Sequence, residues 1–246
     1  WVAKVFGEFN RPRTTVRSLF YYALRRVEPD YPICGGFVGE IRVTRQFDES
    51  DASRLVKWAT LASELGYIPR DALLKEVPGI HVLAPDYRPS GAHAELWIDR
   101  SALNPLIWPV CNRYGITLVS VSGARLDDAL RDPRTGARGE EALLLCMADL
   151  SPSGLSFVRA LEDAVSGSGI RLTHMALTPE QVARLHIPMV RADKKAADKQ
   201  YRDLLRSAGL DGRMMAELDA LEVCYPGGIA GFLEGLIREH VISAHM

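Results

Sequence analysis

The chain has 246 residues, 47% of them hydrophobic, and its formal net charge at pH 7 is −1. A chain of this length and composition can fold as one large domain or two small ones with a hydrophobic core. A net charge so close to zero excludes a general attraction for nucleic acid, so any DNA affinity must come from local patches of positive charge. The four cysteines are scattered without a CxxC pair, and no apolar run approaches the roughly 18 residues that span a membrane. We therefore expect a cytoplasmic protein without a zinc site, a disulfide framework or a membrane partner.

A short cationic helix is the first strong pattern in the chain. Thr15 is a suitable N-cap for a helix over residues 16–26, in which apolar residues recur at helical spacing. Basic residues cover the same stretch, namely Arg13, Arg17, Arg25 and Arg26. Because a cationic helix can follow a phosphate backbone, this stretch is a candidate DNA contact, with a solvated basic helix as the alternative.

The segments that follow predict a hairpin, a helix and a linker. Residues 31–39 are rich in glycine but lack a phosphate-loop lysine, so they predict a turn or a wing, and residues 40–44 predict a short strand. Residues 51–65 carry an apolar stripe at helical spacing and predict an amphipathic helix. Residues 78–93 contain several prolines and predict a linker into the second part of the chain.

Two later strands each end in a carboxylate. A short apolar segment beginning at Ala94 ends at Asp99, and a continuous apolar run beginning at Leu143 ends at Asp149. In α/β sheets, side chains at strand ends project into a crevice outside the sheet, where ligands and metals bind. An aspartate there could hold a divalent cation, and the alternative is a helix-capping turn after Asp149.

The remaining segments complete an α/β pattern. Helices are predicted over residues 104–114, 178–185 and about 229–241, and strands over residues 116–123 and 169–177. A polar, basic segment at residues 131–139 predicts a solvated loop, with a phosphate contact as the alternative.

The two acidic strand ends resemble the toprim fold, a metal-binding fold of topoisomerases, primases and related nucleases. Residues 97–103 (Trp-Ile-Asp-Arg-Ser-Ala-Leu) and 148–154 (Ala-Asp-Leu-Ser-Pro-Ser-Gly) are similar to the Trp-Val-Glu-Lys-Asp-Ala-Leu and Gly-Asp-x-Asp-Pro-Ser-Gly sites of the topoisomerase VI A subunit and its meiotic relative Spo11. Residues 216–221 resemble a Glu-Leu-Asp-Ala-Leu signature of the same group. The resemblance implies an α/β protein with an N-terminal winged-helix-like domain (1–90) and a toprim domain (91–246).

The same resemblance implies a nucleophile in the first domain. The family carries a catalytic tyrosine in a motif like (Thr)-x-Arg-(Asp)-Ile-(Phe/Tyr)-Tyr, and residues 15–21 (Thr-Val-Arg-Ser-Leu-Phe-Tyr) match it nearly position by position, with Ser18 in place of an acidic residue. The match places Tyr21 at the nucleophile position. A phenol with a pKa of about 10 needs a neighbouring cation or base to ionise, and Arg17 could supply the cation. The alternative is that Tyr21 packs on the apolar face of its helix.

In the family, Mg²⁺ bound by the toprim carboxylates assists DNA cleavage. The resemblance implies that Asp99, Asp149 and Ser151 stand at the metal positions in this chain. Asp99 replaces a glutamate and Ser151 replaces the second aspartate, and Mg²⁺ prefers carboxylate and water oxygens, so we expect weak or lost binding. Glu95, earlier on the same strand, could compensate, with a glutamate at the surface or at the edge of the core as the alternative.

The resemblance leaves three functions open. The first is a homodimer that binds double-stranded DNA at the nucleoid and cleaves it through Tyr21, with the tyrosine of one subunit meeting the toprim site of the other. The second is a degenerate structural subunit that binds DNA or a partner and cleaves nothing. The third is a metal-dependent toprim nuclease of a plasmid-defence system. No GHKL-type ATPase signature occurs in the chain, so ATP-driven strand passage would require a separate ATPase partner of the B-like or condensin-like kind.

Overall fold

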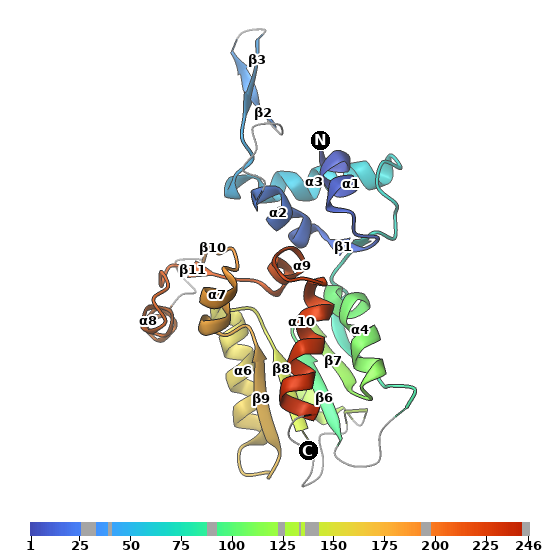
Figure 1. Ribbon diagram of the computed structural model, residues 1–246, viewed down its shortest axis with the longest axis vertical. Coiled ribbons are helices and arrows are strands. Elements are labelled where there is room, and N and C mark those ends of the chain that lie inside the picture. Colours follow the sequence, from blue (N-terminus) through green and yellow to red (C-terminus); the bar gives the residue numbers. More distant parts are fainter. Residues whose placement is uncertain are drawn as a thin grey trace. The chain divides into compact units, whose positions relative to one another are not determined.

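The structure is a computed structural model that describes residues 1–25, 33–38, 41–87, 93–122, 126–132, 134–135, 143–192 and 198–242. The chain divides into two compact units, Trp1–Lys75 and Glu76–Met246 (Figure 1). The second unit therefore begins earlier than the boundary expected near residue 90.

The first unit combines helices with a two-stranded hairpin. The predicted cationic helix is confirmed, and its N-cap is Thr15, whose hydroxyl accepts a hydrogen bond from the Ser18 N–H at 2.9 Å. The hairpin lies between the second and third helices in the chain, where the glycine-rich turn or wing and the short strand were expected. The described elements are α1 (Val2–Phe9), β1 (Thr14–Thr15), α2 (Val16–Arg25), β2 (Ile33–Val38), β3 (Ile41–Arg45), α3 (Ala52–Glu64) and β4 (Leu73–Leu74), with β1 and β4 paired in parallel.

The second unit is an α/β domain built on a mixed five-stranded sheet. Its sheet strands are β5 (Gly79–Leu83), β6 (Ala94–Ile98), β7 (Thr117–Ser122), β8 (Leu143–Met147) and β9 (Arg171–Ala176), and a separate pair is formed by β10 (Val190–Arg191) and β11 (Met214–Met215). Its helices are α4 (Asn104–Arg113), α5 (Leu126–Arg131), α6 (Pro152–Val165), α7 (Pro179–Leu185), α8 (Lys199–Ser207), α9 (Leu221–Cys224) and α10 (Gly228–Ile237), which continues into a π-helical turn at Arg238–Ile242.

The order of the strands places a topological switch point within this sheet. The order is β5-β7-β6-β8-β9, with β5 antiparallel and the other four parallel. The chain leaves β6 through α4 toward β7, and it leaves β8 through α6 toward β9, so the two crossovers run in opposite directions along the sheet (Figure 1). Right-handed crossovers in opposite directions lie on opposite faces. The carboxyl ends of β6 and β8 therefore flank the switch point where α/β sheets bind ligands.

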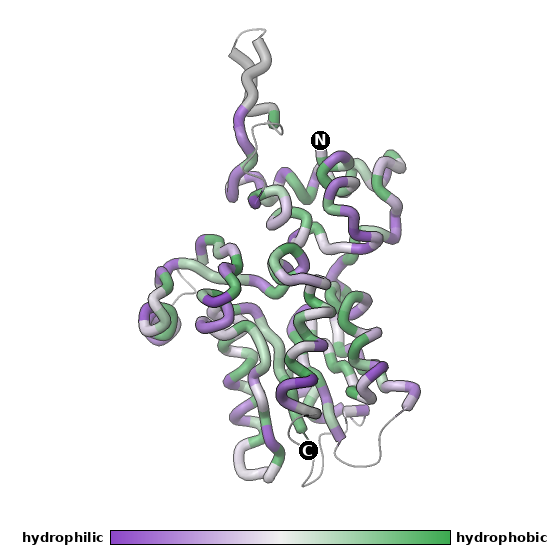
Figure 2. Tube along the Cα trace, viewed as in Figure 1, coloured by the Kyte–Doolittle hydropathy of each residue, from purple (hydrophilic) through white to green (hydrophobic). Residues whose placement is uncertain are grey.

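Local sequence explains the interior strand β8 and the helix that follows it. All five side chains of β8 are buried, as expected for a parallel strand covered on both faces, and the strand is hydrophobic throughout (Figure 2). On one face, Trp97 and Cys146 pack in a core cluster with Val158 and Leu161 of α6. Gly154 lies in the first turn of α6 and cannot be replaced by a larger residue, because a Cβ there would collide with the Asp149 carbonyl oxygen.

The segment expected as a linker contains a strand instead. Residues 79–83 form β5, which pairs in antiparallel register with β7 from Gly79↔Ser122 to Leu83↔Leu118. The linker prediction is therefore wrong for this part of the segment. Proline and glycine at its start are typical of a linker, and the strand that follows is a short edge strand whose side chains are only half-buried.

None of the helices that the structure describes has both the length and the apolar composition needed to cross a membrane. Within the described residues, only the two segments Leu218–Cys224 and Gly228–His240, counted together, satisfy both criteria, and these segments are bent at 101° to each other.

Candidate functional site

The candidate site lies at the carboxyl ends of β6 and β8. These strands are adjacent and parallel, with Ile98 paired to Met147, so the residues that follow them emerge side by side. Asp99 follows β6 and Asp149 follows β8. The structure thus brings together two of the three predicted metal positions at one edge of the sheet.

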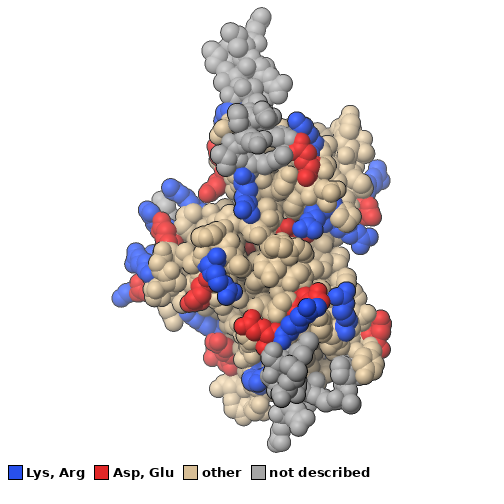
Figure 3. Space-filling view, viewed as in Figure 1, with Lys and Arg blue, Asp and Glu red and all other residues tan. Residues whose placement is uncertain are grey.

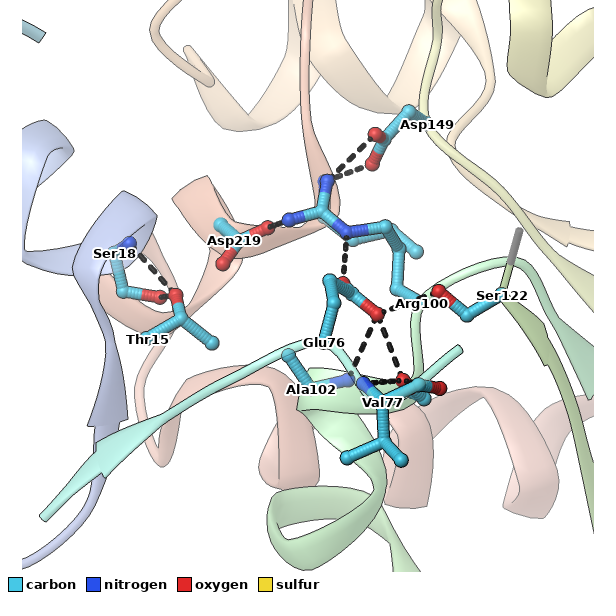
Figure 4. Close-up of polar contacts among 11 residues, drawn as sticks. Thr15, Ser18, Glu76, Val77, Arg100, Ala102, Ser122, Asp149 and Asp219 are labelled. Atoms are coloured by element: carbon cyan, nitrogen blue, oxygen red, sulfur yellow. Dashed lines mark hydrogen bonds and ion pairs between the residues drawn. The ribbon is translucent and has the colours of Figure 1, made fainter. Parts of the chain in front are cut away.

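Arg100 forms the centre of this site (Figure 4). Its guanidinium donates from Nη1 to Asp149 Oδ2 at 3.0 Å, from Nη2 to Asp219 Oδ2 at 2.6 Å and from Nε to Glu76 Oε1 at 2.9 Å. Burial alone would lower the pKa of Arg100, but the surrounding carboxylates, Asp219 first, raise it above its ordinary value. The arginine is therefore a permanent cation that joins three separate segments of the chain.

Glu76 anchors one side of the guanidinium. Its Oε2 accepts hydrogen bonds from the hydroxyls of Ser101 (2.8 Å) and Ser122 (2.9 Å) and from the Ala102 N–H (3.2 Å). Burial would raise the pKa of Glu76, but these hydroxyl donors and Arg100 hold it below the ordinary value. Glu76 is therefore an ionised partner of Arg100 at neutral pH.

Asp149 has hydrogen bonds on both carboxylate oxygens. Oδ2 accepts from Arg100, and Oδ1 accepts from the Leu218 N–H at 2.8 Å. Burial, followed by repulsion from Asp99, Asp219 and other nearby carboxylates, raises the pKa of Asp149 to about 8 in spite of the attraction of Arg100. The Asp149 carboxyl group is therefore fixed in position by two hydrogen-bond donors. Burial and the neighbouring carboxylates disfavour its ionised form.

Ser151 has a structural role in this arrangement. Its hydroxyl accepts a hydrogen bond from the Gly154 N–H at 3.0 Å and makes a second hydrogen bond with the Ser153 hydroxyl at 3.1 Å. It is the N-cap of α6, with Pro152 at the first helical position. The capping turn that the sequence offered as the alternative is present at this strand end.

Asp99 contributes a buried carboxylate oxygen to the site. Its Oδ1 is buried and has no hydrogen-bond partner. Burial raises the pKa of Asp99 to about 6, with Arg100 opposing the shift and Glu76 and Asp219 adding to it. A buried carboxylate oxygen without a donor is costly when charged, and this cost shifts Asp99 toward its neutral form.

The donor set does not fit a magnesium ion. Ser151 offers a neutral hydroxyl that already caps a helix, and both oxygens of Asp149 accept hydrogen bonds from protein donors. Asp99 Oδ1 is buried without a hydrogen-bond partner. Among the residues that the structure describes, no three His, Cys, Asp or Glu side chains are arranged to hold a metal ion. Mg²⁺ demands near-octahedral oxygen ligands and gives up water reluctantly, so this set would bind it poorly.

Glu95 does not compensate for the missing ligand. It is fully buried near the start of β6, where Oε2 accepts from the indole N–H of Trp97 at 2.9 Å and Oε1 bonds His93 Nε2 at 3.1 Å. It lies at the opposite end of the strand from Asp99, which favours the structural role.

The predicted nucleophile of the first unit is buried. The side chain of Tyr21 is 0% exposed, and the Arg17 guanidinium lies over its ring at 5.6 Å from the centroid and over the Phe20 ring at 4.8 Å. The structure thus brings Arg17 and Tyr21 together through a cation–π contact. Tyr22 is only partly buried, and burial raises its pKa. In this conformation Tyr21 would reach a phosphate only after α2 moved.

Two of the predicted DNA-contacting arginines, Arg13 and Arg25, lie near the two ends of α2. The Arg13 side chain is 54% exposed and pairs at 3.7 Å with the exposed Asp71. Arg25 is exposed in the last turn of α2. Arg26 falls outside the described residues. An exposed pair of this length is weak, so Arg13 remains available to a phosphate.

Sequence reasoning missed three members of the site, namely Glu76, Arg100 and Asp219. Asp219 is 0% exposed although it lies in an otherwise apolar Leu-Asp-Ala-Leu run, and a carboxylate in such a run was a signal of a buried ionic contact. The isolated bridge between Leu150 and Ala216 carries this segment across the end of β8. Arg100 directly follows Asp99, and a cation at an acidic strand end was the second signal.

Comparison of the chain with protein-family models and with curated proteins gives no match.

Proposed function

We propose that the chain is a DNA-binding protein of the topoisomerase VI A and Spo11-like kind in which Arg100 takes the place of the divalent cation, so that it acts as a structural subunit and does not cleave DNA. It would bind double-stranded DNA as a homodimer, and any ATP-driven step would belong to a separate ATPase partner. The proposal combines the sequence resemblance with the chemistry of the strand-end site.

The observation that best supports this proposal is the hydrogen bonding of Asp149. Asp149 is the one residue of the two acidic motifs that keeps the family's aspartate, and both of its oxygens accept hydrogen bonds from protein donors, Arg100 and the Leu218 N–H. A guanidinium that bridges three carboxylates supplies the positive charge that a metal would otherwise supply at a strand-end site.

The distribution of charge supports a DNA contact in the first unit. Residues 1–75 contain 12 Lys and Arg against 9 Asp and Glu, whereas residues 76–246 contain 18 against 22. The positive excess thus lies in the unit that carries the cationic helix α2, although the whole chain is close to neutral. Local positive charge is what non-specific DNA affinity requires.

Metal binding gives the first test. We expect no saturable heat when Mg²⁺ or Mn²⁺ is titrated into the wild-type protein at millimolar concentration, because the described residues include no group of three His, Cys, Asp or Glu side chains arranged to hold a metal ion. Asp149→Ala is the matched variant and should give the same flat titration. A clear binding signal in the wild type that disappears in Asp149→Ala would contradict the structural-subunit proposal.

DNA binding gives the second test. We expect Arg13→Gln combined with Arg25→Gln to weaken binding of a short duplex uniformly across sequences and to lower the salt slope of the binding constant by about two. The matched control is Lys57→Gln combined with Lys75→Gln, which removes the same charge from exposed positions of the same unit. Fluorescence anisotropy over a series of salt concentrations measures both. Equal losses in the two double variants would show that α2 is not the contact.

The buried Oδ1 of Asp99 favours a second candidate, magnesium-dependent cleavage through Tyr21. If the metal titration is positive, a covalent protein–DNA adduct that Tyr21→Phe abolishes would identify tyrosyl transfer. Hydrolysis that survives Tyr21→Phe would instead identify the nuclease.

A further inference from the structure

The outward face of α3 carries a concentration of exposed apolar side chains. Among the residues that the structure describes, six large hydrophobic side chains are exposed, and four of them lie on α3 or within three residues of its end. These four, each more than half exposed, are Val56, Leu61, Leu65 and Tyr67. Single exposed apolar residues are ordinary, but a group of them on one element marks a surface that binds another molecule.

The spacing of the sequence places these side chains on one side of the helix. Exposed residues recur along α3 at intervals of three and four, which share one face of an α-helix. The members of this α3 face are Val56, Lys57, Thr60, Leu61, Glu64 and Leu65. The opposite side is buried at Leu55, Ala59 and Ala62, and α3 packs against α1 and α2. The α3 face is therefore the side that the fold of the first unit leaves exposed.

The backbone holds this face in a fixed shape. The Thr60 hydroxyl donates to the Val56 carbonyl oxygen at 2.9 Å, so it needs no polar partner from another molecule. At the end of the helix, the N–H groups of Tyr67 and Ile68 both donate to the Ala62 carbonyl oxygen, at 2.8 and 3.2 Å. Because the Ile68 side chain is fully buried, this turn is anchored. The α3 face thus requires little ordering when it binds, which lowers the cost of association.

The α3 face carries one charge of each sign. Charged side chains of both signs are interspersed over the side of the molecule that Figure 3 shows, but on the α3 face they are limited to Lys57 and Glu64. These two residues lie two turns apart, or about 10 Å along the axis. Within the described part of the chain, neither is in an ion pair. Both charges can therefore pair with a complementary surface.

A second copy of α3 in the antiparallel direction complements this pattern. With a two-fold axis at the middle of the α3 face, beside Leu61, Lys57 faces Glu64 of the partner subunit. The same operation brings Val56 opposite Leu65 of the partner subunit. Charges thus meet opposite charges and the apolar ends meet each other, as a self-complementary interface requires. A parallel arrangement would instead place like charges against each other.

We infer that the α3 face binds a second copy of this chain, with the two α3 helices antiparallel about a two-fold axis. Burial of the apolar side chains drives the association, and the two exposed ion pairs select the orientation. A contact of one helix face is at the small end of the range for specific interfaces, so we expect a dissociation constant in the micromolar range. The inference gives the homodimer of the proposed function a contact surface, and it rests on that function for its role in DNA binding. Its test does not use DNA.

Self-association of the full chain gives the first measurement. Sedimentation velocity at protein concentrations from about 1 to about 100 µM should show the wild type passing from monomer to dimer. We expect Leu61→Ser to weaken the dimer by at least about 10-fold, because the interface loses two apolar side chains at its centre. Val77→Ser is the matched control and should leave the association unchanged, since Val77 is as exposed as Leu61 (54% and 52%) but lies outside the α3 face. Circular dichroism checks the folding of each variant.

Exchange of the two charges tests the antiparallel arrangement. Lys57→Glu and Glu64→Lys should each weaken the dimer, because each creates two contacts between like charges. The double variant should restore the wild-type association, since opposite charges face each other again. Contact within one chain cannot produce this rescue, because the two residues lie two turns apart on the helix. Removal of the charge alone, as in Lys57→Gln, should cost little, because an exposed ion pair contributes little.

The outcomes separate this inference from the proposed function. A dimer that Leu61→Ser weakens and that the double charge exchange restores would support the inference, and it would do so even if the protein bound no DNA. A dimer that Leu61→Ser leaves unchanged would overturn the inference and leave the homodimer of the proposed function standing. Failure of the double exchange to restore a dimer that the single exchanges weaken would also overturn it. A wild type that stays monomeric at about 100 µM would overturn both the inference and the homodimer, whereas duplex binding by that monomer would keep the DNA contact of α2.

Discussion

Replacement of Arg100 by glutamine is expected to lower the free energy of unfolding by about 3–5 kcal/mol at neutral pH. The Arg100 side chain is only 20% exposed, and it is the cation shared by Glu76, Asp149 and Asp219. Because the pKa of Asp149 is already raised, the loss falls mainly on Glu76 and Asp219, which would lose the cation that they share. Chemical denaturation followed by circular dichroism measures the change.

The control for this variant is Arg113→Gln. Arg113 is 63% exposed and pairs with Glu234 at 3.3 Å, so its loss should hardly change stability. The cost of Arg100→Gln should also shrink at about pH 5, because protonation relieves the repulsion among the remaining carboxylates. A cost for Arg100→Gln as small as that of the control would contradict the central role of this residue.

The same variant tests the exchange of a metal for an arginine. If Arg100 supplies the charge of a divalent cation, then millimolar Mg²⁺ or Mn²⁺ should raise the melting temperature of Arg100→Gln and leave that of the wild type unchanged, since a ligand stabilises only the state that binds it. An equal rise in both proteins would show that Arg100 does not occupy the place of the ion.

The second large effect expected is a loss of stability as pH rises from about 4 to about 8. The ordinary carboxyl value is 3.8, whereas the pKa in the folded protein is about 6 for Asp99 and about 8 for Asp149. Between these values the folded state holds protons that the unfolded state has released. The free energy of unfolding contributed by this pair therefore falls as pH rises through the window, and the penalty is complete above the folded pKa.

Asp99→Asn is expected to remove part of this dependence. At about pH 8 the variant should be more stable than the wild type by roughly 1–3 kcal/mol, since one pKa unit corresponds to about 1.4 kcal/mol. Asp132→Asn is the control, because Arg134 lowers the pKa of Asp132 to about 2 and its loss should destabilise the protein instead. Denaturation curves at several pH values measure both variants. A parallel pH profile for Asp99→Asn and the wild type would show that Asp99 is ionised at low cost.

Much of the local structure could be predicted from the sequence. The capped helix α2 and the buried strand β8 lie where apolar periodicity and turn residues placed them. Helix α7 likewise begins where Thr178 and Pro179 predicted, with Thr178 in a capping box with Gln181. Each of these elements depends on residues within a few positions of one another, so the chain itself contains the signal. The strand at Gly79–Leu83 was missed because an edge strand with half-buried side chains has a weak pattern.

The α/β character of the second unit, the cationic helix of the first and the acidic ends of β6 and β8 could all be predicted from local sequence. The contacts of those acidic ends could not, because they depend on tertiary packing. Arg100 meets Asp149 across 49 positions and Asp219 across 119 positions of the chain. Such contacts depend on the order of strands in the sheet and on the Leu150–Ala216 bridge. The local pattern of apolar and polar residues does not predict these ion pairs, because they form only when the layers of the domain pack together.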